Sequence, residues 1–343
     1  MILPHKLKYG DTIAIISLSS GIAGDKSIIW RTYQGIERLK SIFNLNVKIM
    51  PNALAGSDYL YNHPEKRADD LHKALLDPEV KAIINCIGGS ESIRIIPFLD
   101  PNIIKNNPKI FLGYSDITSL HMYFYKLGIT TYYGPALLTD FAENVAMDQY
   151  TIDYIYKTLF TTDASHNIKN ATYIRDSNVR WEKENQIIQR GYIDKGEYEL
   201  INGRGVVSGK LIGGCLETLN NLRGTDLFPS SSTFKNAILF IENSGSFNNT
   251  LIIEQNIRTL GYLGILKNVN GIIIGTPANG ADKEEIKNIW KKMMKEWQIE
   301  DTPVLYNASF GHNEPKFILP YGVKAEINAE QLSFTIKENT VSN

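Results

Sequence analysis

The sequence has little cysteine, no excess of charge of either sign and no long apolar run. Its 343 residues include two cysteines, Cys86 and Cys215, which lie far apart. This excludes a disulfide-dense scaffold and a zinc site built on paired cysteines, so we interpret both as small core residues in a reducing compartment. The formal net charge of −1 provides no electrostatic footprint for nucleic acid or an anionic membrane.

Membrane and secretion signals are also missing. No run approaches the ~18 apolar residues of a spanning helix, and the first ten residues have neither a long apolar region nor a small-residue cleavage site. Apolar residues make up 43% and charged residues 21% of the chain, which is ordinary for a globular protein. We therefore expect a soluble, cytoplasmic protein of one large or two medium domains, with no nucleic-acid or membrane partner.

Residues 1–160 alternate between strand and helix patterns. Continuous apolar runs of strand length alternate with amphipathic or proline-initiated helical stretches. This order predicts an α/β domain with a doubly wound parallel sheet, whose site lies at the carboxyl ends of the strands. The clearest strands are expected at 12–17, 80–87 and 109–113, and the clearest helices at 28–42 and 64–76.

The regular pattern dissolves between residues 161 and 205. This segment is polar, and stretches of this length without periodicity are usually disordered or functional. We therefore predict a linker and an active-site loop. Residues 206–343 are expected to form a smaller β-rich domain, in which the alternating stretch 325–336 suggests antiparallel strands or a small barrel.

Ser115 occupies a position of chemical interest. Residues 109–126 combine an apolar strand, this serine and an amphipathic helix. A serine at such a turn is held out of the packed layers, and the helix N-terminus beside it offers N–H groups to an oxyanion. The segment GYSDI at 113–117 lacks the second glycine of the G-x-S-x-G elbow. Considered by itself, the segment favours a simple helix cap.

An activated serine needs a base and a group that orients the base. Of the six histidines, His312 stands in a glycine-containing loop directly after the strand expected at 303–306. His121 follows Ser115 by more than a turn and a half of helix, so it more plausibly supports packing. Glu242 ends an apolar strand, where a carboxylate is costly without a partner. It is expected to orient an imidazole, pair with a lysine or cap the following turn.

Five segments in order resemble the LD-carboxypeptidase family of serine peptidases, which includes microcin C self-immunity peptidases. Each segment is weak evidence alone, but five in register over nearly the whole chain are specific. They are GGSESIR at 88–94 with PFLD at 97–100, GYSDIT at 113–118, GGCLETL at 213–219 with RGT at 223–225, FIENSG at 240–245, and GH at 311–312.

The resemblance implies a catalytic triad of Ser115, His312 and Glu242. It implies an oxyanion hole formed by backbone N–H groups at Gly89 and Asp116. It further implies an N-terminal α/β domain, a smaller β-rich C-terminal domain, a homodimer, and no metal or cofactor. The expected reaction is cleavage of an amide bond next to a terminal carboxylate-bearing residue.

The family contains two branches with different small-molecule substrates. One trims the terminal D-alanine from muropeptides during cell-wall recycling. The other hydrolyses the bond between an aminoacyl group and a nucleotide analogue, and its members resemble one another in a longer loop with an aromatic residue that stacks on the base. Trp181, amid charged neighbours in the polar insert, fits such stacking. Alternatively, Trp181 folds onto its own domain.

Three further residues are expected to bind substrate. Glu217 and Asn220 lie one helical turn apart and fit the aminoacyl end, or else act as capping or interdomain residues. Ser90, in the glycine loop, completes the set. We expect the nucleotide-analogue amidase, with the muropeptide enzyme as the alternative. A non-enzymatic nucleotide- or sugar-binding protein is the third hypothesis, supported by an incomplete glycine pattern at 21–24.

Overall fold

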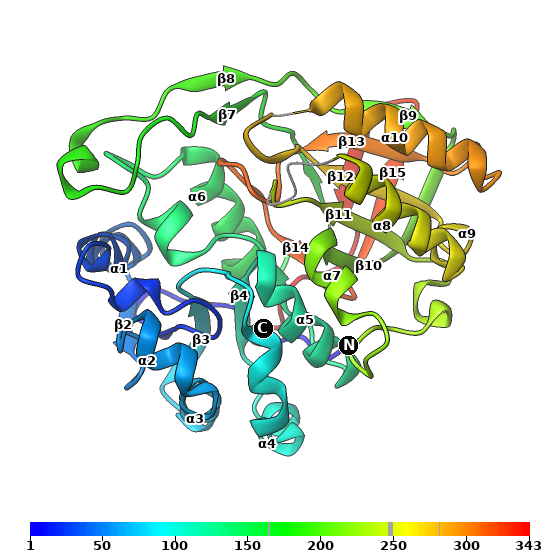
Figure 1. Cartoon of the computed structure of the whole chain (residues 1–343). Helices are drawn as coiled ribbons and strands as arrows, with labels where there is room; N and C mark the ends of the chain where they lie inside the picture. Colours follow the sequence, from blue (N-terminus) through cyan, green and yellow to red (C-terminus); the bar gives the residue numbers. More distant parts are fainter. Residues whose placement is uncertain (164, 246–249, 281) are drawn as a thin grey trace.

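Two β-sheets, one built mainly from each half of the chain, lie side by side (Figure 1). The structure is a computed structural model and describes residues 1–163, 165–245, 250–280 and 282–343. Within these ranges, no helix has both the length and the apolar character needed to cross a membrane.

The N-terminal sheet has the strand order β14-β5-β4-β3-β1-β2. The strands β1 to β5 are parallel, and β14 from the other half of the chain pairs antiparallel with β5. The bounds are β1 Thr12–Ile16, β2 Asn46–Ile49, β3 Val80–Asn85, β4 Ile110–Gly113, β5 Tyr132–Tyr133 and β14 Leu319–Pro320. The helices of this half are α1 Ile29–Phe43, α2 Ser57–Asn62, α3 Pro64–Leu76, α4 Pro101–Asn106, α5 Thr118–Lys126 and α6 Gln149–Ile155.

Helices cover both faces of this sheet, as a doubly wound fold requires. Successive strand residues point to opposite faces. Ile13 and Ile15 therefore belong to one buried cluster with residues of α1, whereas Ala14 and Ile16 belong to another with residues of α3 and α5. Both faces being buried explains why these strands are continuous apolar runs.

The C-terminal sheet has the order β6-β16-β15-β10-β11-β12-β13-β9. Its long strand β10 pairs antiparallel with β15 through its first half and parallel with β11 through its second. The strands are β6 His166–Ile168, β9 Glu199–Asn202, β10 Val206–Cys215, β11 Ile238–Glu242, β12 Gly271–Gly275, β13 Val304–Ala308, β15 Lys324–Asn328 and β16 Ser333–Ile336. The helices are α7 Leu216–Leu222, α8 Thr250–Tyr262, α9 Ile265–Asn268 and α10 Lys283–Glu296.

The predicted fold class is confirmed: a parallel-dominated N-terminal α/β sheet stands beside a separate β-rich C-terminal sheet. The stretch 325–336 forms two antiparallel strands, β15 and β16, at one side of an open sheet and not a barrel.

The structure differs from our expectation between residues 161 and 205. The strands β6 and β9 of this segment are the two edge strands of the C-terminal sheet. Two more, β7 (Tyr173–Arg175) and β8 (Tyr192–Asp194), pair with each other and form an arm, residues 173–194, that we call the β7–β8 arm (Figure 1). Strands of three or four residues carry too few alternations to be detected in a sequence.

Candidate active site

Ser115 stands at a sharp turn between strand β4 and helix α5. Its backbone φ of 63° is left-handed, a conformation that is costly for a residue with a side chain and that gathers at functional sites. The Thr118 hydroxyl donates to the Ser115 carbonyl oxygen at 2.7 Å, and the Ser115 N–H donates to the Tyr133 hydroxyl at 3.1 Å. These bonds hold the elbow in place, and the predicted strand, serine and helix are present.

Two glycines permit the close packing of this site. A Cβ at Gly88 would lie 2.7 Å from the Cβ of Ser115, closer than real Cβ atoms come. Gly311 has a φ of 95°, and a Cβ there would lie 2.7 Å from the Glu242 carboxylate. A side chain at either position would therefore displace a reactive group.

The structure brings together Ser115, His312 and Glu242, which come from three separate elements. His312 Nε2 lies 2.9 Å from Ser115 Oγ, and His312 Nδ1 lies 2.8 Å from Glu242 Oε2. The Tyr133 hydroxyl donates to the other carboxylate oxygen, Oε1. Glu242 is buried at the end of β11, whereas the His312 side chain, after β13, is 21% exposed. The geometry is that of a nucleophile, a base and a carboxylate that orients the base.

The pKa shifts of Glu242 and His312 agree with these roles. Burial by itself would raise the pKa of Glu242, but His312 and the Tyr133 hydroxyl hold this pKa below its usual range. Burial would likewise lower the pKa of His312, yet the Glu242 carboxylate more than offsets it and the pKa of His312 is raised. The imidazole is therefore stabilised in the charged form that it takes on accepting a proton.

Ser115 opens into a cavity of about 560 Å³. Its lining includes His312 and four residues that the sequence predicted for the site: Gly89, Ser90, Asp116 and Glu217. Among the described lining residues there is no lysine or arginine. The described part of the chain also contains no cluster of three or more His, Cys, Asp or Glu side chains able to hold a metal ion.

The Asp116 side chain has a role that the sequence did not suggest. Its Oδ2 atom accepts hydrogen bonds from the Ser19 hydroxyl at 2.6 Å, the Glu91 N–H at 2.8 Å and the Ser92 N–H at 2.7 Å. This one carboxylate oxygen fixes the glycine loop after β3 against the elbow after β4. An acidic residue directly after the serine was visible in the sequence, but a first-turn charge explained it equally well.

Glu217 reaches the cavity from the first turn of α7. Its Oε1 accepts from the N–H of Ser244 at 2.8 Å and from the hydroxyl of Ser244 at 3.0 Å. Its Oε2 accepts from the Cys215 thiol at 3.1 Å. Both carboxylate oxygens are thus held in place beside the cavity, and Cys215 is buried as expected.

Our expectation for Asn220 needs correction, because this residue does not line the cavity. It borders a small crevice between α7 and α8 with Arg223 and Asn256. The cavity is lined instead by Glu217, Thr218 and Asn221. At about 100° per residue, these three span one face of α7, and Asn220 lies beyond its edge.

Trp181 also lies outside the set of cavity-lining residues. Its ring stacks on Arg31, whose guanidinium carbon is 4.5 Å from the ring centre, and packs against the core of the N-terminal half. Arg31 is itself buried and donates to the Leu138 carbonyl at 2.6 Å and to Asn144 at 2.7 Å. This arrangement is the alternative considered from the sequence, in which Trp181 folds onto its own domain.

The glycine pattern at 21–24 has a structural explanation. A Cβ at Gly21 would lie 2.6 Å from the Gly56 carbonyl oxygen, and one at Gly24 would lie 2.3 Å from the Leu54 carbonyl oxygen. Backbone packing therefore accounts for both glycines without a bound nucleotide or sugar.

Comparison with known proteins identifies the family. Residues 13–134 match the LD-carboxypeptidase N-terminal domain, and residues 208–327 match the LD-carboxypeptidase C-terminal domain. The chain belongs to the LD-carboxypeptidase family of peptidases, which confirms the resemblance found in the sequence.

Three curated relatives span nearly its whole length. YocD of Bacillus subtilis is 32% identical over 329 residues, 94% of this chain and 95% of YocD. The microcin C7 self-immunity protein MccF of Escherichia coli is 29% identical and covers 99% of this chain and 97% of MccF. A Bacillus subtilis protein named as a murein peptide carboxypeptidase is 27% identical and covers 97% of this chain and 94% of that protein.

Solved structures agree in fold. An MccF-like protein from Streptococcus pneumoniae, in complex with AMP, superposes with a TM-score of 0.88 at 30% identity and covers 96% of this chain and 99% of its own. MccF in complex with aspartyl sulfamoyl adenosine superposes with a TM-score of 0.85 at 26% identity and covers both chains completely, 100% of each.

Proposed function

We propose that this protein is a serine hydrolase that cleaves the amide bond between an aminoacyl group and a nucleotide analogue. One observation carries the proposal: the His312 ring bridges Ser115 Oγ and the buried Glu242 carboxylate at 2.9 and 2.8 Å. Membership of a carboxypeptidase family supports hydrolysis. The microcin immunity relative and the complexes of its fold with AMP and aspartyl sulfamoyl adenosine support a nucleotide-bearing substrate.

In the first half of the proposed reaction, Ser115 Oγ attacks the carbonyl carbon of the aminoacyl group. His312 Nε2 accepts the hydroxyl proton, while its Nδ1–H donates to Glu242 and keeps the ring in the required tautomer. The carbonyl oxygen becomes an oxyanion, for which the N–H groups of Gly89 and Asp116 are the proposed donors. Both residues line the cavity with Ser115, which supports this role.

The tetrahedral intermediate then collapses. The C–N bond breaks, its electron pair goes to the departing nitrogen, and His312 returns the proton to that nitrogen. An ester of Ser115 with the aminoacyl group remains. A water molecule, deprotonated by His312, hydrolyses this ester, so that the free amino acid leaves and the serine hydroxyl is restored.

Substrate contacts follow from the cavity. We assign the Glu217 carboxylate to the ammonium group of the aminoacyl end and Ser90 to a polar group of the substrate, because both residues line the cavity. Trp181 is the proposed stacking partner of the base, a role that requires it to leave its place over Arg31. The proposed enzyme acts in the cytoplasm as a homodimer, without metal or cofactor.

A muropeptide LD-carboxypeptidase is the second candidate. The stacking of Trp181 on Arg31 favours it, since the cavity as described has no aromatic platform from the β7–β8 arm. The murein peptide carboxypeptidase relative supports it as well. The same three reactive residues serve in either case, because both substrates present a carbonyl carbon next to a nitrogen leaving group.

Parallel hydrolysis assays separate the two candidates. Wild-type protein and Ser115→Ala are each given an aminoacyl sulfamoyl adenosine and an L,D-linked tetrapeptide. We expect the wild type to cleave the nucleotide conjugate and Ser115→Ala to lose several orders of magnitude in rate. Tetrapeptide cleavage without turnover of the conjugate would assign the protein to cell-wall recycling. Unchanged rates in Ser115→Ala would contradict both candidates.

A further inference from the structure

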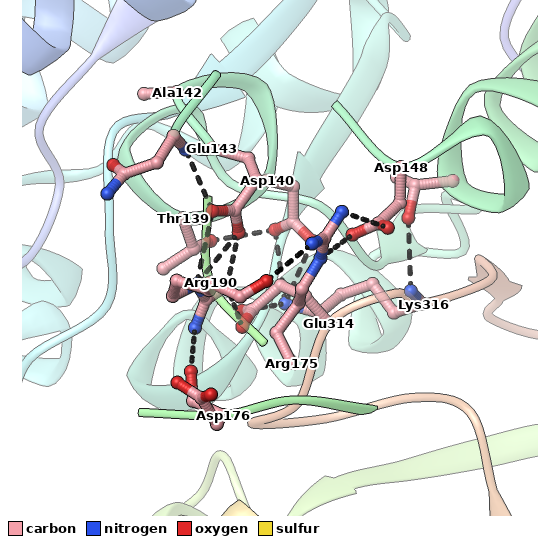
Figure 2. A network of polar contacts seen from close by, with 12 residues as sticks. Thr139, Asp140, Ala142, Glu143, Asp148, Arg175, Asp176, Arg190, Glu314 and Lys316 are labelled. Carbon is pink, nitrogen blue, oxygen red and sulfur yellow. Dashed lines mark hydrogen bonds and ion pairs between the residues drawn. The ribbon is translucent and has the colours of Figure 1, made fainter. Parts of the chain in front are cut away.

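A buried network of five ionisable side chains lies near His312. Figure 2 shows Lys316 and Arg190 among the carboxylates of Asp140, Glu143 and Glu314. Lys316 Nζ is 3.0 Å from Asp140 and 3.2 Å from Glu314, whereas Arg190 is 2.8 Å from Glu314 and also pairs with Glu143. The Lys316 side chain is fully buried, and those of Arg190 and Glu314 are each 12% exposed. Neither cation belongs to the triad, so the proposed chemistry leaves the network unexplained.

The network joins three parts of the chain that are distant in sequence. Glu314 and Lys316 follow His312 by two and four residues. Arg190 belongs to the β7–β8 arm, which also carries Trp181. The remaining two carboxylates come from residue 140, in a π-helical turn that follows β5, and from residue 143, two positions after that turn. Arg190 is therefore the direct ionic link between the arm and the loop of the base.

Contacts lead from this network to the imidazole. Lys316 Nζ lies 4.1 Å from the centre of the Tyr114 ring. The Tyr114 ring in turn packs edge-on against His312, with ring centres 5.0 Å apart. The next residue, Asn313, donates from its side chain to the Thr276 carbonyl oxygen at 2.7 Å. The Arg175 N–H of the arm donates to the Glu314 carbonyl oxygen at 2.7 Å. The loop is thus held by hydrogen bonds as well as by the ion pairs.

The ion pairs strongly stabilise the charged form of the buried Glu314 carboxylate. Burial by itself would raise the pKa of Glu314, but Lys316 and Arg190 hold this pKa far below its usual range. Without Arg190, Glu143 and Glu314 would lose a shared guanidinium in a buried place. Glu314 would keep one cation, Lys316, which it shares with Asp140. A buried carboxylate that loses part of its compensation is unfavourable, so we expect Glu314 to move or to take a proton, two residues from His312.

We propose that Arg190 is a positioning residue, which fixes the His312 loop through its ion pair with Glu314. The β7–β8 arm thereby controls the reactivity of Ser115 in addition to carrying Trp181. This inference rests on the proposed function in one respect, the assignment of Ser115 as nucleophile and His312 as base. A displacement of about 1 Å in a catalytic group costs on the order of 100-fold in rate, so a remote ion pair of this kind is able to govern catalysis.

The test measures the reactivity of Ser115 without any substrate. A fluorophosphonate probe labels an activated serine, and the second-order rate constant of labelling depends on the base. We expect Arg190→Ala and Glu314→Gln each to slow labelling about 10- to 100-fold. Arg190→Lys should recover part of the rate, because lysine keeps the charge but cannot form the two-carboxylate contact of a guanidinium. In turnover assays kcat should fall by a similar factor while KM changes little.

Arg175→Met is the matched control. Arg175 lies in the same arm, and its side chain, which is 4% exposed, pairs with Asp148 at 2.8 Å and forms no ion pair with Glu314. Its backbone N–H donates to the Glu314 carbonyl oxygen at 2.7 Å, a hydrogen bond that Arg175→Met keeps. Its removal should lower the thermal unfolding temperature as much as Arg190→Ala does, yet leave the labelling rate near that of the wild type. Equal slowing in Arg175→Met would overturn the proposal, since general loosening of the arm would then explain both.

A double variant supplies an independent criterion. Arg190→Ala with Glu314→Gln should label no more slowly than the slower single variant, because both changes break one link. If the double variant loses the product of the two single-variant rate factors, the two residues act independently, which would contradict the proposed link through one ion pair. If Arg190→Ala fails to fold, Arg190→Lys and Glu314→Gln carry the same comparison.

The two proposals fail in different ways. If Ser115→Ala is labelled like the wild type, the nucleophile assignment in the proposed function is wrong. If labelling requires Ser115 but proceeds at the wild-type rate in Arg190→Ala and Glu314→Gln, the positioning role alone is wrong.

Discussion

Replacing Glu242 by glutamine tests how the imidazole is held. Both carboxylate oxygens are used as acceptors, Oε1 by the Tyr133 hydroxyl and Oε2 by His312 Nδ1 at 2.8 Å. A glutamine amide has one acceptor oxygen and an NH₂ group, so one of the two donors must lose its acceptor. If the NH₂ group faces His312, the ring must carry its proton on Nε2, and that nitrogen can no longer accept the proton of Ser115.

The size of the effect follows from this loss of the correct tautomer. A carboxylate-to-amide change in the triad of trypsin lowers kcat about 10⁴-fold while geometry is kept. The same loss is expected for Glu242→Gln and corresponds to about 5.4 kcal/mol of transition-state stabilisation, at 1.36 kcal/mol per factor of ten.

The pH profile provides a second readout with a definite sign. A general base must be neutral, so kcat/KM rises with pH through the pKa of His312. Glu242 raises this pKa, which puts the wild-type midpoint above about 6.5, the ordinary value for histidine. In Glu242→Gln, burial acts without the carboxylate and lowers the pKa, so the midpoint moves below about 6.5.

Steady-state hydrolysis across the pH range measures both effects. Tyr133→Phe is the control, because it keeps the carboxylate beside His312, although it removes both the donor to Glu242 Oε1 and the acceptor of the Ser115 N–H. It should lower kcat about 10- to 100-fold, as expected mainly from the lost hydrogen bond to a charged group. A Glu242→Gln variant with nearly native kcat and an unshifted midpoint would refute the reasoning.

Three other outcomes are expected. Trp181→Ala should raise KM about 5- to 150-fold on a nucleotide-bearing substrate, from about 1–3 kcal/mol of stacking, with little change in kcat; an equal effect on a tetrapeptide would mean that Trp181 is structural. Gly88→Ala should abolish most activity while the protein still folds, because its Cβ would lie 2.7 Å from that of Ser115; native turnover would show that the elbow can shift. Activity should survive exhaustive EDTA treatment, since the proposed steps use only groups of the protein and water; loss that zinc restores would overturn the serine mechanism.

Local signals made the regular elements predictable. The helix expected at 64–76 is α3 with unchanged bounds, because proline at its first position and its apolar spacing mark it locally. The strands at 12–17 and 80–87 were found within two residues of their ends, since both are buried apolar runs. The short strands of 161–205 were missed because their stability comes from sheet neighbours far along the chain.

The candidate site was predictable in part. Ser115 and Glu242 stand out in the sequence because they lie at strand ends. Their contact with His312 depends on how the two sheets pack together, which no local pattern encodes. Only the family resemblance predicted that the three residues form one site. The rotation of α7, which excludes Asn220 from the cavity, depends on how the helix packs. The ion pair between Arg190 and the His312 loop could not be predicted either, because charged residues in a polar insert usually face solvent.

The proposed triad is divided between the two sheets, and this division has a consequence for the synthesis of the chain. Ser115 follows a strand of the N-terminal sheet, whereas Glu242 ends one strand of the C-terminal sheet and His312 follows another. The strand at residues 319–320, which pairs beside Tyr133, completes the first sheet last. A ribosome must therefore extend the chain at least to His312 before serine and imidazole can meet. Nascent chains and fragments that stop before His312 lack the proposed base, so we expect them to leave Ser115 unreactive.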